Sequence, residues 1–80
     1  MDTKNEKLHA MVDNYIFDPL LMCVVASNPC INSSDIHKIA EHYIKESRKG
    51  NYSGNHVFKV LEQNPKTSLE DLEKIYREPF

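Results

Sequence analysis

The chain has 80 residues, of which 28% are charged, and a formal net charge of −2 at pH 7. A chain of this length forms one domain with a single modest core, which leaves little room for a deep active site. Its 10 Lys and Arg are interspersed with 12 Asp and Glu, so the pattern argues against the basic stripe that binds nucleic-acid phosphates.

The first half of the chain predicts three helices. From Leu8 to Ile16, apolar residues recur at i, i+3, i+4, i+7 and i+8, which indicates an amphipathic helix over about residues 4–16. Asp18 is a good N-cap before a first-turn proline, and residues 19–27 are apolar on nearly every side. We therefore expect this second helix to be buried on most faces. A third helix should end near residue 49, with Gly50 as a left-handed cap.

The second half predicts a loop and two further helices. Residues 50–55 contain both glycines of the chain, and apolar spacing resumes over residues 55–63. Asn64-Pro65 stops that helix, because proline disfavours the helical conformation of the residue before it. Thr67 and Glu70 have the spacing of a capping box at the start of a last helix that continues to about residue 78.

An internal repeat relates these helices. Asn28-Pro29 and Asn64-Pro65 are 36 residues apart (64 − 28), and the same offset pairs Asp35 with Asp71. An offset of 28 aligns the apolar positions of helix 4–16 with those of the third helix. The chain is therefore expected to be a single helical domain made of a half unit (4–17) and two units (18–49 and 54–78). We predict an all-α fold of five short helices, a solenoid-like stack of helix, Asn-Pro turn and helix.

Segments 24–40 and 60–72 resemble the variant leucine-rich repeat family. They share its apolar pair, two positions, Asn-Pro and a following capped helix. The resemblance implies an all-helical right-handed superhelix that acts as an interaction scaffold. The family's unit is shorter than 36 residues, and Ile31 occupies the position of Thr67. Capping of the third helix is therefore expected from Asn32 or Ser33.

The residues that carry chemistry do not form a recognisable motif. Cys23, Cys30 and the four histidines contain no C-x-x-C or H-x-x-x-H pair, so no metal site and no cofactor are predicted. Ser33 and Ser34 lie next to Asp35 and His37, but side chains two apart diverge on a helix and their better use is capping. We predict no catalytic residue and a non-enzymatic protein. Two cysteines and a polar first segment favour a cytoplasmic chain with free thiols, and no segment is long enough to span a membrane.

These observations favour a protein-binding function, in which the chain acts as a small adaptor or inhibitor. A phage origin of the chain is compatible with this function. The alternatives are a nucleic-acid-associated helical protein and a structural subunit that self-assembles, for example as a homodimer. The candidate partner-binding residues are polar side chains of the third and fifth helices and an aromatic side chain of the loop between the units: His37, Glu41, His42, Tyr52, Glu73 and Arg77.

Overall fold

A computed structural model describes residues 3–77 of the chain, with side chains from residue 6 onward. The chain is all-α, as predicted, and the described residues contain no strand. No helix in this part of the chain is long and apolar enough to cross a membrane. The five helices are α1 (Thr3–Tyr15), α2 (Pro19–Ser27), α3 (Ser33–Arg48), α4 (Asn55–Gln63) and α5 (Leu69–Arg77).

Two predicted helix boundaries are formed by the expected residues. The Asp18 side chain accepts a hydrogen bond from the amide of Leu21 at 3.2 Å, which caps the start of α2. Gly50 has φ +92° after the end of α3, and its amide donates to the carbonyl of Ser47. The amide of the next residue donates to the carbonyl of Glu46, which completes a Schellman motif.

The predicted cap of α5 was wrong, and that of α3 was right in its residue, Asn32, but not in its hydrogen bond. The Thr67 hydroxyl donates to the carbonyl of Leu61 at 2.6 Å instead of capping α5, and the Ser68 hydroxyl accepts from the amide of Asp71. Thr67 is buried beside the end of α4, so its hydroxyl satisfies a last-turn carbonyl there. Asn32 is the N-cap of α3 by position, but its side chain makes no capping hydrogen bond.

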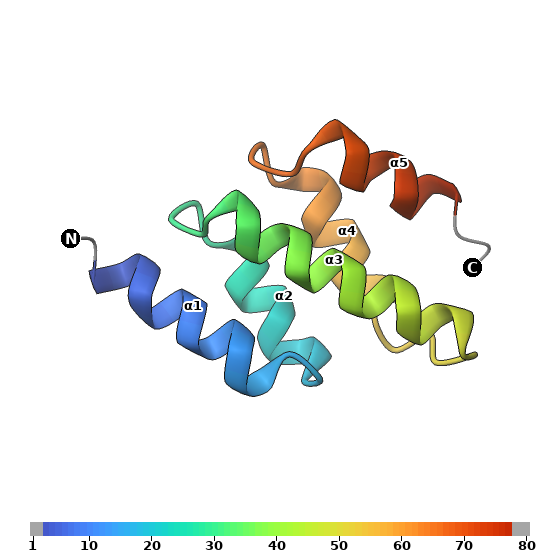
Figure 1. The fold of residues 1–80 in the computed structure, drawn as a ribbon, viewed down its shortest axis with the longest axis horizontal. Coiled ribbons are helices and arrows are strands. Elements are labelled where there is room, and N and C mark those ends of the chain that lie inside the picture. The colour runs from blue at the N-terminus through green and yellow to red at the C-terminus, as the bar shows by residue number, and fades with distance from the viewer. Residues whose placement is uncertain (1–2, 78–80) are drawn as a thin grey trace.

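The helices form two layers. Figure 1 shows α1, α3 and α5 side by side in one layer, with α2 and α4 behind them. Each described helix contacts only the next helix and the one after it, so α1 does not touch α4 or α5. Contacts restricted to near neighbours along the chain are typical of stacked helical units.

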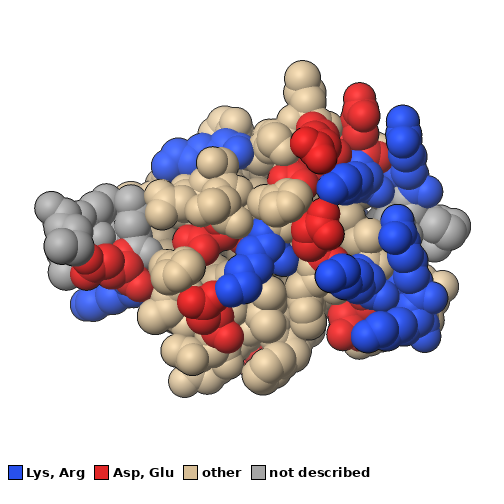
Figure 2. All heavy atoms as spheres, viewed as in Figure 1, with Lys and Arg blue, Asp and Glu red and all other residues tan. Residues whose placement is uncertain are grey.

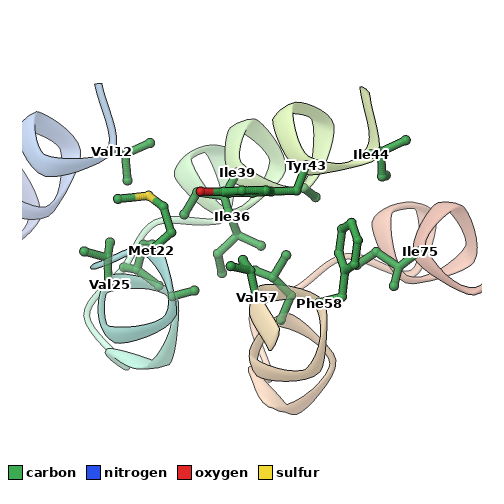
Figure 3. Packing of buried hydrophobic residues seen from close by; sticks show 14 of the residues in the cluster. Val12, Met22, Val25, Ile36, Ile39, Tyr43, Ile44, Val57, Phe58 and Ile75 are labelled. Carbon is green, nitrogen blue, oxygen red and sulfur yellow. The ribbon is translucent and has the colours of Figure 1, made fainter. Parts of the chain in front are cut away.

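The core lies between the two layers, where side chains from all five helices meet (Figure 3). Tyr43 of α3 is 2% exposed, and its hydroxyl donates to the carbonyl of Ile16 at 2.6 Å. Burial raises the pKa of Tyr43 to about 12, so the phenol remains protonated at neutral pH. The fully buried members include Val12, Met22, Ile36, Ile39, Leu61 and Ile75.

Asn64 joins the two helices of the second layer. Its Nδ2 donates to the carbonyl of Ala26 in the last turn of α2 at 2.6 Å. Its Oδ1 accepts from the amide of Lys66 at 2.9 Å, which shapes the turn into α5. The carboxamide therefore supplies a partner to a carbonyl that the end of α2 leaves without one.

Candidate functional site

Two polar contacts join α1 to α3. Nδ1 of His9 lies 2.8 Å from Oδ1 of Asp35 at the start of α3. One turn further along α1, the carboxylate of Asp13 accepts a hydrogen bond from Nζ of Lys38. The Asp35 side chain is 3% exposed and that of His9 is 58% exposed, so a surface imidazole provides the partner of a buried carboxylate.

Equivalent contacts join α3 to α5. Nδ1 of His37 lies 2.7 Å from Oδ1 of Asp71, and Nζ of Lys74 donates to Oε1 of Glu41 at 2.8 Å. His37 and Glu41 follow His9 and Asp13 of the first contacts by 28 positions. Asp71 and Lys74 follow Asp35 and Lys38 by 36 positions, so both offsets are those of the sequence repeat. We call the two sets the interhelix polar pairs. The four-residue pattern was present in the sequence, but only Asp35 and Asp71 were aligned there.

The interhelix polar pairs shift the pKa values of His9, Glu41 and Lys74. A hydrogen bond and the charge of Asp35 raise the pKa of His9, and Asp13 adds to the effect. The hydrogen bond from Lys74 lowers the pKa of Glu41, and the same bond raises the pKa of Lys74. These three side chains are all more than a third exposed, so solvent screens each pair and its contribution to stability is small.

The His9 contact predicts a pH dependence of stability. Its pKa in the folded protein is above the ordinary value of 6.5, so protonated His9 stabilises the fold below about pH 6.5, and this contribution is lost as the pH rises through the folded pKa. We expect the free energy of unfolding from urea titrations to decline between about pH 6 and pH 8. The decline should be smaller in His9→Gln and unchanged in His56→Gln, which alters an exposed histidine of α4. Equal declines in the wild type and His9→Gln would contradict the assignment.

The structure places three of the predicted partner-binding residues together. His37, Glu41 and His42 line a shallow depression on the α3 surface, with the ring of His42 edge-on against Tyr43 at a centroid distance of 4.9 Å. His37 and Glu41 also hold α5 through the interhelix polar pairs. Both side chains therefore have a structural role beside the predicted one. The remaining lining residues are Ile16, Lys38 and Lys45.

The other three predicted residues come from different elements. Tyr52 lies in the loop between α3 and α4 and is 51% exposed. Glu73 and Arg77 are exposed on α5. Figure 2 shows that acidic and basic side chains alternate over much of the α1, α3 and α5 face, and that basic side chains gather over the C-terminal ends of α3 and α5. Lys45, Arg48 and Arg77 are in those last turns, where cations complement the helix dipole.

The outward face of α2 is apolar, contrary to the expectation that this helix is buried on most faces. Leu20 and Val24, one turn apart, are 79% and 65% exposed, and Phe17 just before the helix is 72% exposed. Met22, Val25 and Ala26 occupy the opposite side and form the buried face. We call Phe17, Leu20 and Val24 the α2 apolar surface. Ser27 lies on the same side of the helix as Leu20 and Val24 and is exposed as well. This polar residue was the signal in the sequence that the side faces solvent.

The groups that carry chemistry are dispersed over the described residues. No three His, Cys, Asp or Glu side chains among them lie close enough to hold a metal ion. Cys23 and Cys30 are free, partly buried thiols. Burial raises the pKa of the Cys23 thiol, which keeps it protonated and weakly nucleophilic at neutral pH.

Comparisons with known proteins give no relative. No protein-family model, no curated protein and no solved structure matches this chain.

Proposed function

We propose that the protein is a non-enzymatic protein–protein interaction module that acts as a small adaptor or inhibitor. The α2 apolar surface carries the proposal. Its three large apolar side chains are each at least 65% exposed, and Leu20 and Val24 lie on the side of α2 opposite to the buried Met22, Val25 and Ala26. Exposed apolar surface of this kind costs free energy in water and commonly marks a site that a partner covers.

We further propose that the chain is a short solenoid. Two features support it: the helices contact only near neighbours, and the interhelix polar pairs recur at the repeat spacing. A solenoid exposes an open end on each side of the stack, where a further helix can dock. The α2 apolar surface lies at one of these ends.

The test compares two surfaces in the same binding assay. Proteins that copurify with the tagged chain from its native host would be identified by mass spectrometry, and binding of the purified partner would be measured by calorimetry. We expect Val24→Glu, which places a charge in the α2 apolar surface, to weaken binding at least tenfold. The double variant Glu73→Lys/Arg77→Glu tests the predicted α5 residues in the same way. A protein that binds no partner in the purified assay would contradict the proposed function.

A further inference from the structure

The interhelix polar pairs follow a fixed register along the layer of α1, α3 and α5. On its edge towards α5, α3 carries a histidine and, four positions later, a carboxylate: His37 and Glu41. On its edge towards α1 it carries an aspartate and, three positions later, a lysine: Asp35 and Lys38. Each end of the layer therefore has one set of these positions that faces no helix of the described chain.

The free edge of α5 carries different charges at the positions of His37 and Glu41. At the offset of 36, Glu73 replaces the histidine and Arg77 replaces the carboxylate. Both side chains are exposed, and neither forms an ion pair or a side-chain hydrogen bond within the described part of the chain. A helix that lies beside this edge must therefore offer a base to Glu73 and an acid to Arg77.

The free edge of α1 carries such a base and such an acid. In the register of the repeat, Lys7 corresponds to Asp35 and Asp71, and Glu6 corresponds to Glu70. Lys7 and Glu6 are both exposed. Figure 1 shows α1 and α5 at opposite edges of the layer, and its three helices run in the same direction. The α1 edge of one copy can therefore lie beside the α5 edge of another, as α5 lies beside α3.

The first charge pair of such a contact joins Glu73 to Lys7. Their places are those of His37 and Asp71, where Nδ1 and Oδ1 approach to 2.7 Å. The exchange of a histidine for an acid on one edge is thus matched by the exchange of an aspartate for a lysine on the other. Either exchange alone would remove the attraction across the contact.

The second charge pair joins Arg77 to Glu6. Within the chain, Nζ of Lys74 lies 2.8 Å from Oε1 of Glu41 and 3.6 Å from Oε1 of Glu70, so the side chains at those two positions reach the same point. Arg77 has the position of Glu41, and Glu6 has that of Glu70. They can form an ion pair without an intervening lysine, and α1 has an alanine where that lysine would be.

We propose that copies of this chain stack head to tail, with α1 of one copy beside α5 of the next. The contact joins two different surfaces, so a dimer keeps one of each free and growth continues beyond it. Exposed ion pairs alone contribute little, and an apolar side chain of α5 adds to them. Tyr76 is 70% exposed, whereas its repeat counterparts Val12 and Ala40 are fully buried. The last helix of the layer therefore exposes a position that both preceding helices bury.

Sedimentation equilibrium of the full chain tests the stacking. The average mass in dilute salt should rise with concentration past that of a dimer, up to about 1 mM protein. It should fall towards that of the monomer in about 0.5 M salt, because salt screens exposed ion pairs. Val24→Glu should leave the stacking unchanged, so stacking and the proposed partner binding at the α2 apolar surface can fail independently.

Two charge reversals test the register. Glu73→Lys and Lys7→Glu each place like charges opposite one another and should each weaken association about tenfold. An equimolar mixture of the two variants should assemble as the wild type does, because every contact between unlike copies again joins opposite charges. Lys49→Glu, an equal charge change at the C-cap of the central helix α3, should have no effect.

Three results would overturn the inference. One is a wild-type chain that remains monomeric at about 1 mM, even if a natural partner loses binding to Glu73→Lys, which would assign the α5 edge to another protein. Another is a dimer that Lys7→Glu leaves intact, which would indicate a two-fold contact between α5 helices. The third is a mixture of the two charge reversals that associates no better than either variant alone.

Discussion

Replacing Asn64 with alanine should lower the free energy of unfolding by about 2–3 kcal/mol, whereas the same change at its repeat counterpart Asn28 should lower it by about 0.5–1 kcal/mol. Both asparagines precede a proline and both accept a hydrogen bond from the amide two residues later. Only Asn64 also donates across the stack, to the carbonyl of Ala26. The difference between the two variants therefore isolates the contact that joins α2 to α4.

Asn64→Ala should lower the free energy of unfolding more than Asn28→Ala because it leaves the carbonyl of Ala26 without a hydrogen-bond donor. Ala26 is fully buried, so its carbonyl cannot turn to water, and an unpaired buried carbonyl costs more than the average hydrogen bond contributes. Asn64→Asp should be at least as harmful, because a carboxylate then faces that carbonyl oxygen. Asn28→Asp should be close to neutral. Urea titrations followed by circular dichroism would measure all four variants, and equal losses at positions 28 and 64 would refute the explanation.

Helix positions could be predicted from this sequence because local signals mark them. Asp18 before a proline and Gly50 after a basic last turn act through neighbouring backbone groups. The cap of α5 was misplaced by one residue for the opposite reason. Thr67 has a suitable position for capping, but the carbonyl of Leu61 on another helix takes its hydroxyl. The spacing of residues along the chain cannot reveal that a distant carbonyl competes with the nearby backbone amides for the same hydroxyl.

The candidate site was less predictable, because it depends on which helix covers which face. The sequence shows that α2 is apolar on nearly every side, but not that the side of Ala26 is buried while the side of Val24 remains exposed. The role of His37 was similarly hidden, since its partner Asp71 is 34 residues away.

Gly54 should be the position where one added methyl group has the largest effect. It is buried at the N-cap of α4, and a Cβ atom there would lie 2.8 Å from Cγ of Tyr43 and closer still to Cδ1. The Tyr43 ring cannot move away easily, because it is buried and its hydroxyl donates to the carbonyl of Ile16. Gly54→Ala should therefore lower the free energy of unfolding by about 1–3 kcal/mol through overpacking.

Gly50→Ala is the matched control, since it adds the same methyl group to the same loop. A Cβ at Gly50 meets no atom within 4 Å, but the residue has φ +92°, so its cost of about 1–2 kcal/mol is a backbone cost. Combining each glycine variant with Tyr43→Leu in a double-mutant cycle separates the two causes. The smaller side chain should remove most of the Gly54→Ala penalty and leave that of Gly50→Ala intact. A Gly54→Ala penalty that persists in the Tyr43→Leu background would rule out the steric explanation and point to the backbone of the α4 N-cap.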